Sequence, residues 1–397
     1  MSGYARLPMD ADSMLVEARR ETGIDLEDAA AREPLARLVS SLNEEAGFSA
    51  EGALGKHQYL LRFLKNRLRM QRDLEAHPEI LDIELLPPVV INGMARTGST
   101  KLQKILAATG LFNWLPMWLC MNPSSWSGEP KEDLGPRIED VNRYIDWFKE
   151  RSPQAQSAHA IAAEEPEEDS YIMMHSLVSQ TLSGYANAPS YLEWYLGQNL
   201  ASQFEYVRDT LKYLVWQGLA DPNKPFVLKS AMSLGYEDGL LAAYGKLNIL
   251  VTHRDPVETV PSTCRLAELF RKPYSDAPVD HSNFLVGSSG LMESHMDFRE
   301  RRPEVDFLDI DYRALRDDSC STVARILAFA GIDGNDEAIE NVRAWDAANP
   351  KNRHGSYRYQ LADFGFSPPE VDSAFSSYLG FVQKQGIAFP RLENELV

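Results

Sequence analysis

The chain contains the run Pro88-Val89-Val90-Ile91-Asn92-Gly93-Met94-Ala95-Arg96-Thr97-Gly98-Ser99-Thr100. Its apolar first part predicts a buried strand, and apolar residues at positions 102, 105 and 106 then follow at helical spacing. A glycine-bearing loop between a strand and a helix is a layout that holds phosphate, because the first N–H groups of a helix have no partners within it. The position of the lysine in a nucleotide-hydrolysing loop is taken by Ser99, and the basic residue is Arg96. This pattern points away from an ordinary ATPase or kinase.

Strand and helix patterns alternate through the second half of the chain. We expect strands at 225–229, 247–252 and 305–310, and helices at 235–244, from 256, and at 321–330. The alternation predicts an α/β protein, a P-loop-like three-layer fold with a central parallel sheet. Residues 1–85 read as a helical N-terminal extension. Within the domain predicted at 86–397, residues 113–224 read as a mostly helical insertion and residues 345–397 as a C-terminal flap and helix.

A second candidate anion site follows the strand predicted at 247–252. The run Thr252-His253-Arg254-Asp255-Pro256 ends that strand and begins a helix, with Asp255 as its cap. Ligands of parallel sheets bind beyond the carboxyl ends of the strands, so Arg254 is aimed at the ligand edge. Ser262 lies about two turns into the helix. The two residues either bind a second phosphate, or Arg254 forms a surface ion pair with Asp255 or Glu258.

Composition limits the classes of function. The chain has 397 residues and a net charge of −18, which argues against a broad surface for nucleic acid or for polyanionic polysaccharide. Its three cysteines have no metal-ligand or redox spacing, and no apolar run is long enough to span a membrane, so we expect a cytoplasmic protein. The helix predicted at 58–74 has a basic face, which either contacts a membrane or is the solvated side of a packed helix.

The two motifs together resemble those of sulfotransferases that use 3′-phosphoadenosine 5′-phosphosulfate (PAPS), in particular the bacterial group with an arginine in the phosphosulfate loop. The first motif resembles Gly-x-Pro-Arg-Ser-Gly-Thr-Thr and the second His-Arg-Asp-Pro with a serine eight residues after the arginine. This chain departs from the first at Ala95, Thr97 and Ser99, which leaves the hydroxyl groups in place. Further segments that match in order are Glu165-Pro166-Glu167-Glu168-Asp169, Leu228-Lys229-Ser230, Asn349-Pro350-Lys351 through Gly355, Tyr357-Arg358-Tyr359 and Asp363-Phe364-Gly365.

The resemblance implies transfer of a sulfuryl group from PAPS to an acceptor hydroxyl, with 3′-phosphoadenosine 5′-phosphate (PAP) as the product. It implies two groups of donor-binding residues. The phosphosulfate would contact Arg96, Thr97, Gly98, Ser99 and Thr100, and the 3′-phosphate would contact Arg254 and Ser262, with Arg353 and Gly355 of the C-terminal flap closing over it. No metal site is expected.

Catalytic roles are implied for His159, Lys229, Arg96 and Glu168, with Glu165 as a further rival. His159 is the first candidate for the base that accepts the hydroxyl proton, and Glu165 and Glu168 are rivals or could orient that histidine. Lys229, at the end of a predicted strand, and Arg96 would stabilise charge on the transferring group. The alternative for His159 is a structural or substrate-contacting role, and for the acidic segment the first turn of a helix.

Two other functions stay open on the sequence alone. A small-molecule or nucleoside kinase would need an acid that binds magnesium, for which Asp309 is the available candidate, and a non-catalytic relative would bind nucleotide without turnover. The acceptor is expected to be a small, hydrophobic alcohol. Aromatic residues between 112 and 216, such as Trp147 and Tyr171, either line its pocket or form core. A homodimer is compatible with the sequence, and no nucleic-acid partner is expected.

Overall fold

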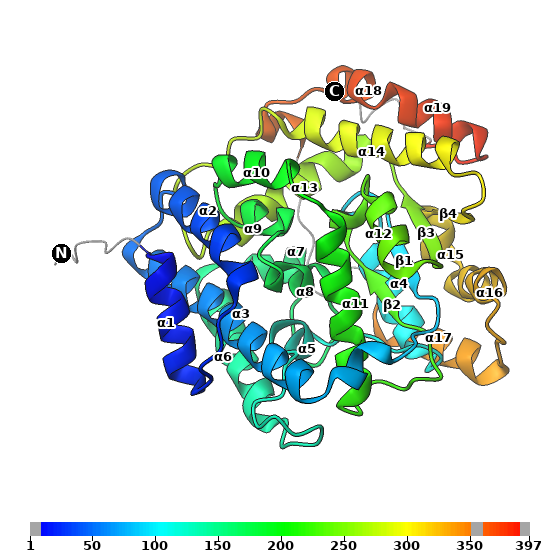
Figure 1. Cartoon of the computed structure of the whole chain (residues 1–397). Helices are drawn as coiled ribbons and strands as arrows, with labels where there is room; N and C mark the ends of the chain where they lie inside the picture. Colours follow the sequence, from blue (N-terminus) through cyan, green and yellow to red (C-terminus); the bar gives the residue numbers. More distant parts are fainter. Residues whose placement is uncertain (1–8, 351–359, 390–397) are drawn as a thin grey trace. The chain divides into compact units, whose positions relative to one another are not determined.

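The computed structural model describes residues 9–350 and 360–389 (Figure 1). The chain divides into two compact units. The first consists of residues 1–85, 115–223 and 267–279, and the second of residues 86–114, 224–266 and 280–397.

The second unit is built on a parallel sheet of four strands. They are β1 (Val89–Asn92), β2 (Val227–Lys229), β3 (Asn248–His253) and β4 (Phe307–Asp311). Their order in the sheet is β2-β1-β3-β4. The register places Val90 beside Leu228 on one side and beside Ile249 on the other. The first strand of the chain is therefore central.

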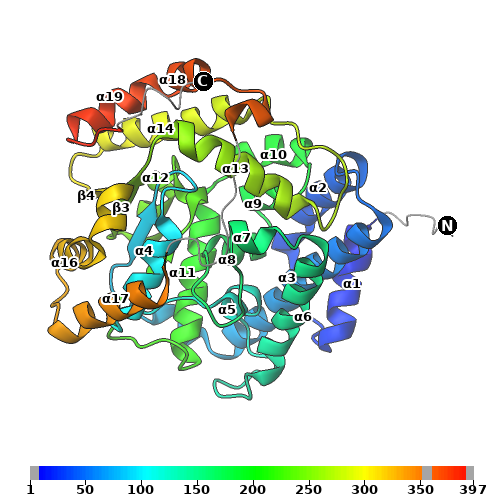
Figure 2. The same cartoon turned by 180° about the vertical axis from the view of Figure 1, so that it is seen from behind.

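Helices cover both faces of this sheet (Figures 1 and 2). Their bounds are α4 (Ser99–Ala108), η2 (Ala231–Ser233), α12 (Glu237–Tyr244), α14 (Phe284–Arg301), α15 (Tyr312–Asp317), α16 (Ser319–Ala330), α17 (Asp336–Ala348), η3 (Leu361–Phe364), α18 (Pro368–Ala374) and α19 (Ser376–Lys384), while α13 (Pro256–Arg271) begins in this unit and ends in the first. Packing between α4, α16 and α17 forms one outer layer, and contacts of α12 and α14 with Asn92 and Phe307 place these helices on the opposite face.

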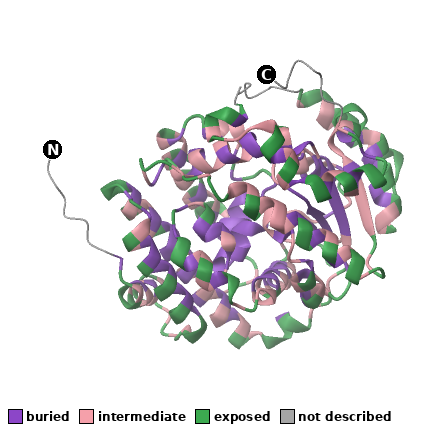
Figure 3. Cartoon of the chain, turned by 90° about the horizontal axis from the view of Figure 1, so that it is seen from above, coloured by how far each residue is buried: buried purple, intermediate pink, exposed green. Residues whose placement is uncertain are grey.

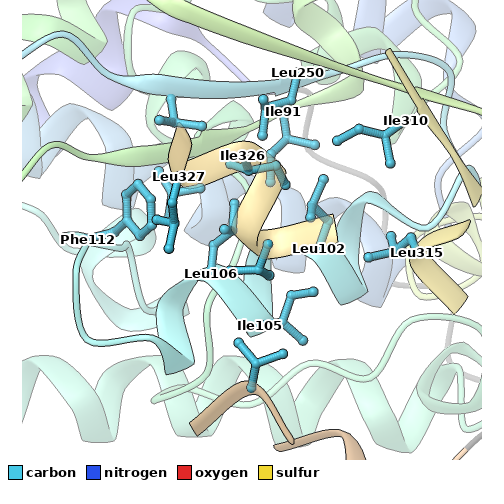
Figure 4. Packing of buried hydrophobic residues seen from close by; sticks show 14 residues of the cluster. Ile91, Leu102, Ile105, Leu106, Phe112, Leu250, Ile310, Leu315, Ile326 and Leu327 are labelled. Atoms are coloured by element: carbon cyan, nitrogen blue, oxygen red, sulfur yellow. The ribbon is translucent and has the colours of Figure 1, made fainter. Parts of the chain in front are cut away.

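The core on the α4 side explains why these segments adopt their structures. Alternate strand residues, Ile91 of β1 and Leu250 of β3 among them, point to one face, where Leu102 and Leu106 of α4 meet Ile326 of α16 (Figure 4). Residues of a strand alternate between faces, and residues three or four apart share one side of a helix. Burial of each such side chain contributes roughly 1.5–3 kcal/mol. The core fixes the start of α4 at the end of β1.

Burial decreases toward one edge of the sheet (Figure 3). Every residue of β1 and β2 is buried, whereas only Ile310 of β4 is buried. A parallel strand covered on both faces reads as an apolar run, as Val89–Ile91 does, whereas β4 alternates apolar residues with Asp309 and Asp311 at the less covered edge.

Helices make up most of the described part of the first unit. They are α1 (Ala11–Thr22), α2 (Ala29–Glu45), α3 (Ala50–Ala76), η1 (Pro78–Asp82), α5 (Met117–Met121), α6 (Gly135–Arg151), α7 (Ala155–Ala158), α8 (Ser170–His175), α9 (Gln180–Gly184), α10 (Pro189–Leu196) and α11 (Ala201–Trp216). The helix predicted at 58–74 is part of α3, which begins where Ser49 caps the N–H of Gly52.

The basic face of α3 is engaged inside the first unit. Arg62 pairs with Asp140, Lys65 with Glu21, and Arg67 with Asp28, at 2.5–3.0 Å. These pairs favour the packed-helix interpretation over a membrane surface. In residues 9–350 and 360–389, no helix has both the length and the apolar character that a membrane crossing requires.

The predicted fold class is confirmed: the chain forms an α/β fold with a parallel sheet of four strands and helices at its N-terminus. The strands expected at 225–229 and 247–252 are parallel, but they are not neighbours, since β1 lies between them. Gly245 and Gly331 end α12 and α16 with positive φ, as the sequence predicts.

Candidate active site

The order of the strands creates a switch point beside β1. From β1 the chain moves to β2 on one side and then to β3 on the other. The loops after β1 and β3 therefore leave the same edge of the sheet in opposite directions, which opens the crevice where ligands of such sheets bind. The loop 93–98 and the run that begins at Arg254 are these two loops.

The loop after β1 is packed tightly against β3. Gly93 has φ 118°, and a Cβ atom there would lie 2.7 Å from the carbonyl oxygen of Thr252, so only glycine fits. The buried hydroxyl of Thr97 donates to the Met94 carbonyl at 2.7 Å and shares a 2.6 Å hydrogen bond with the Thr252 hydroxyl. The Thr97 hydroxyl thus shapes the loop, and its contact with phosphosulfate stays a prediction.

Gly98 forms the junction between the loop and α4. Its φ is 90°, and a Cβ atom would meet the ring of Tyr312 at 2.7 Å. No side chain caps the helix at this position. The N-terminal turn, which includes Ser99 and Thr100, thus carries the partial positive charge of a helix start, which attracts anions.

Arg96 connects the two candidate anion sites. Its φ of 70° is left-handed, and its Nε donates to the Ser262 hydroxyl at 2.9 Å. Its carbonyl oxygen accepts from Arg254 Nη1 at 3.1 Å. The sequence pairs Ser262 with Arg254, whereas the structure joins Ser262 to Arg96, so the three residues form one cluster.

Arg254 also makes the surface ion pair that the sequence left open. Its Nε and Nη2 donate to Glu258 at 2.8 and 2.5 Å, and its guanidinium lies 4.4 Å from the centre of the Tyr312 ring. The Asp255 carboxylate instead accepts from the Val257 N–H at 3.0 Å and caps α13. The predicted surface ion pair is therefore present, with Glu258 as the partner. Arg254 also lies beside the loop, and its binding of a phosphate stays a prediction.

Lys229 reaches the other end of the loop. It is the last residue of β2, it is buried, and its Nζ donates to the Thr100 hydroxyl at 3.4 Å. Because β2 and β1 are parallel neighbours, their carboxyl ends lie side by side. The structure thus places an ammonium group beside the first turn of α4.

His159 belongs to the first unit, where it pairs with a carboxylate. It follows α7, and its Nε2 lies 2.9 Å from Glu167 Oε2, with both side chains less than a tenth exposed. The other Glu167 oxygen accepts from the Glu168 N–H at 2.9 Å. The partner of His159 is therefore Glu167, which lies in the matched acidic segment between the two glutamates that the sequence suggests for this role, Glu165 and Glu168.

The acidic segment precedes a helix rather than forming its first turn. The helix α8 begins at Ser170, and Asp169 makes no side-chain cap. Burial raises the pKa of Cys120, and the nearby carboxylates of Glu167, Asp169 and Glu168 raise it further. The helix-start alternative for residues 166–169 is therefore wrong by one turn, because the first helical residue lies after them.

Comparison with known proteins gives the family. A sequence profile described as the sulfotransferase family matches residues 87–336, more than half of the chain and the whole sheet with its loops. The chain belongs to the sulfotransferase family. No curated protein sequence matches this enzyme significantly.

Two solved structures resemble this sulfotransferase. Sulfotransferase STF1 of Mycobacterium tuberculosis is 26% identical, with a TM-score of 0.73, and the match covers 94% of this chain and all of that one. Sulfotransferase STF9 of Mycobacterium avium is 22% identical, with a TM-score of 0.81, and the match covers 96% and 98% of the two chains. The second likeness concerns the fold alone.

Asp309 of the sulfotransferase is engaged in a buried network. Arg299 donates to its two oxygens at 2.7 and 2.9 Å, and His253 Nε2 lies 2.8 Å away. Hydrogen bonds from His253 and Arg299 lower the pKa of Asp309 despite its burial. This carboxylate holds α14 to the sheet, so the acid that a kinase would need for magnesium is already occupied. The described residues contain no group of three or more acidic, histidine or cysteine side chains placed to bind a metal.

The remaining predicted contacts, Arg353 and Gly355, lie outside the described residues.

Proposed function

We propose that this sulfotransferase uses PAPS as donor and transfers its sulfuryl group to the hydroxyl of a small, largely hydrophobic acceptor. One observation carries the proposal: Arg96 contacts Ser262 through its side chain and Arg254 through its carbonyl, at the switch point of the sheet. PAPS has a phosphosulfate and a separate phosphate, and this cluster offers cationic groups for both.

The residues at the sheet edge fit such a donor. The start of α4, with no side-chain cap, and the Lys229 ammonium suit a phosphosulfate. Arg254 and Ser262 suit the 3′-phosphate, and the ring of Tyr312 beneath Arg254 holds its guanidinium in place. Within 86–397, which we take as the catalytic domain, Arg353 and Gly355 would close over this phosphate.

The chemistry of the donor is an activated sulfuryl group on a phosphate leaving group. During transfer the bond from sulfur to the phosphate oxygen breaks, a bond from sulfur to the acceptor oxygen forms, and the acceptor hydroxyl loses its proton. Lys229 and Arg96 would stabilise the negative charge that develops on the leaving oxygen, and the helix start would hold the phosphate oxygens without reorganisation.

His159 would take the proton. The Glu167 carboxylate lies at its Nε2, which holds that nitrogen as the donor and leaves Nδ1 to accept. Glu168 would position Glu167 through its backbone N–H and is the rival base. The proposal therefore assigns proton transfer to the His159–Glu167 pair.

A donor competition tests the proposal. Purified enzyme is incubated with an acceptor panel of alcohols and phenols and with either labelled PAPS or labelled ATP, and products are read by mass spectrometry. Sulfated products from PAPS support the proposal, and phosphorylated products from ATP contradict it in favour of a kinase. Binding of PAP, measured by calorimetry, without any transfer would instead indicate the non-catalytic relative.

Variants assign the roles. Arg96→Ala should lower kcat/KM by about a hundredfold or more, and Arg254→Ala should weaken PAP binding about tenfold or more. Arg316→Ala is the matched control, because Arg316 of α15 is exposed and pairs with its neighbour Asp317. Equal binding of PAP by Arg254→Ala and the parent would contradict the assignment of the 3′-phosphate site.

A further inference from the structure

A buried lysine in the first unit has no carboxylate partner. Lys56 of α3 is 3% exposed, and in the described part of the chain its ammonium makes no hydrogen bond or ion pair. It lies instead over two aromatic rings, 4.0 Å from the centre of Tyr274 and 5.2 Å from that of Tyr59. An ammonium group taken out of water loses hydration that ring faces replace only in part.

A second cation lies close to Lys56. Burial and the charge of Arg271 lower the pKa of Lys56 to about 7, and burial also lowers the pKa of Arg271. The Arg271 Nε donates to the Gly184 carbonyl at 3.2 Å, and no acid side chain among the described residues pairs with it. Two like charges beside each other repel, so the pair is an unfavourable arrangement unless an anion joins it.

The structure holds this arrangement firmly. In α3, a Cβ atom at Gly52 would lie 1.9 Å from the Tyr274 carbonyl, and one at Gly55 would lie 2.5 Å from the Trp147 ring. Glycine at position 52 lets Tyr274 approach α3 closely, and glycine at position 55 leaves room for Trp147 of α6. The hydroxyls of Tyr144 and Tyr274 then meet at 3.3 Å. The Lys56 ammonium thus lies against two tyrosine rings that close packing holds beside α3.

Ring contacts connect this region to His159. The His159 ring meets Phe270, the residue before Arg271, at 6.0 Å between centres, and Phe270 stacks on Tyr185 at 4.9 Å. The Phe270 ring also contacts the Phe148 ring, at 5.2 Å between centres. A continuous layer of packed, largely buried aromatic rings therefore extends, within one unit, from the proposed base to the segment that carries Arg271.

We propose that Lys56, Arg271 and the tyrosines around them bind an acid group of the acceptor, so that the enzyme sulfates hydroxylated organic acids with an apolar body. This inference rests on the proposed function, since it deepens its acceptor class. Lys56 and Arg271 are binding residues in it, while the rings hold the body of the acceptor and His159 meets its hydroxyl.

Calorimetry with matched probes tests the inference. Two hydroxylated acids serve as probes, 3-(4-hydroxyphenyl)propanoate and 16-hydroxyhexadecanoate. Each acid is compared with its neutral methyl ester. All four compounds are titrated into the full-length protein in the presence of PAP. We expect at least one acid to bind about tenfold more tightly than its ester, which corresponds to one paired charge. Lys56→Met and Arg271→Met should each bring this ratio to about one.

Lys272→Met is the control variant, because Lys272 follows Arg271 in sequence but is exposed and pairs with Asp276. It should keep the preference for the acid. Equal binding of acid and ester by the wild-type enzyme, absence of binding by every probe, or an unchanged ratio in Lys56→Met would each overturn the inference.

The pH dependence separates an ammonium site from general attraction. The groups that face Lys56 are Arg271 and Tyr274, Tyr59 of α3, and Tyr144 of α6 behind Tyr59; burial raises the pKa of each tyrosine. Lys56 is thus the group that loses a proton near neutral pH, and the preference for the acid should fall by up to about tenfold per pH unit once the amine deprotonates.

The two proposals fail in different ways. If the acids bind tightly through Lys56 but no sulfuryl group is transferred, the result contradicts the proposed function and supports the acid site. Transfer from PAPS to neutral esters as efficiently as to acids would contradict the acid site and keep the proposed function.

Discussion

Arg96 has a left-handed backbone conformation, which costs free energy for any residue other than glycine. Its φ is 70°, and the conformation is held at both ends, by Ser262 at the side chain and by Arg254 at the carbonyl. Strain of this kind costs roughly 1–3 kcal/mol and persists only where the surroundings impose it. The loop conformation is therefore coupled to α13, whose residues surround the proposed 3′-phosphate site.

Thr97 tests whether the loop must be held from inside. Thr97→Val keeps the shape but removes the hydroxyl that joins Met94 to Thr252. For Thr97→Val we expect a loss of roughly 1–3 kcal/mol of stability and a several-fold higher KM for PAPS. Thr97→Ser keeps the hydroxyl, so its stability and its KM should match those of the wild type. Thermal unfolding and initial rates are the measurements.

The control is Thr263→Val, since the Thr263 hydroxyl bonds only to the Thr259 carbonyl within α13. A Thr97→Val enzyme that matches this control in both stability and KM would show that the loop needs no internal hydrogen bond.

Lys56 should cost stability at neutral pH. Its pKa falls from 10.5 to about 7 on folding, so between these values the unfolded chain binds a proton that the folded protein does not. Stability therefore rises with pH across this window. Lys56→Met should stabilise the protein by roughly 2–3 kcal/mol at pH 7 after the lost ring contacts are subtracted, and the gain should vanish near pH 10.5.

Urea unfolding at pH 7 and pH 10 measures this gain. A destabilised Lys56→Met at pH 7 would contradict the low pKa. A more stable variant that has lost the preference for acids would mean that a destabilising residue is retained for binding, since stability and function commonly oppose each other at binding sites.

At the scale of the element, α3 depends on its glycines. Gly→Ala inside a helix ordinarily stabilises by about 0.5–1 kcal/mol. At Gly52 the new Cβ atom would lie 1.9 Å from the Tyr274 carbonyl, so backbone must move. We expect Gly52→Ala to destabilise by roughly 1–3 kcal/mol and to weaken acid binding, because Tyr274 would shift away from Lys56.

Gly380→Ala in α19 is the counterpart, since nothing lies within 4 Å of its would-be Cβ atom. It should stabilise by the ordinary amount. Thermal unfolding of both variants gives the comparison, and equal shifts in the same direction would contradict the close approach of α3 to Tyr274.

The sequence predicts elements well where local chemistry specifies them. Asp255 and Gly245 mark a helix start and a helix end through hydrogen bonds to their own neighbours, and both are found in the structure. The order of the strands is set by packing between distant segments, so no local signal places β1 between β2 and β3. The Glu167 partner of His159 was missed for the same reason, because the loop between them decides which carboxylate turns inward.

The candidate site likewise has a part that local sequence predicts and a part that only the fold brings together. The residues that we propose for donor binding follow strand ends and belong to motifs, so the sequence could place Arg96, Lys229 and Arg254 at one edge of the sheet. Lys56 belongs to α3 but to no motif. Its neighbours Arg271 and Tyr274 come from a segment far along the chain, so no local signal in the sequence marks it. The structure alone reveals that no acid side chain in residues 9–350 and 360–389 pairs with it.

Across the whole molecule, buried histidines should set the stability in mild acid. Burial lowers the pKa of His175 in the first unit to about 3 and lowers the pKa of His253 in the second. Below pH 6.5 the unfolded chain binds protons at these histidines more readily than the folded protein does, so stability decreases as the pH is lowered. Asp309 acts later, since its lowered pKa means that its contribution is lost only as the pH falls below about 4.

His175→Gln isolates the histidine contribution in the window from pH 6.5 to pH 4. His175 is fully buried, its Nε2 lies 3.1 Å from the Cys120 carbonyl, and its Nδ1 has no partner among the described residues. Glutamine can donate to the same carbonyl but does not titrate, so the slope of unfolding free energy against pH should decrease by up to about 1.4 kcal/mol per pH unit. The comparison is made by urea unfolding at several pH values, with His77→Gln as the control, because the His77 side chain is 40% exposed. Parallel pH profiles for His175→Gln and the wild type would mean that the folded protein admits a proton at this site, and the acid sensitivity would then have to come from His253 and the carboxylates of the sheet.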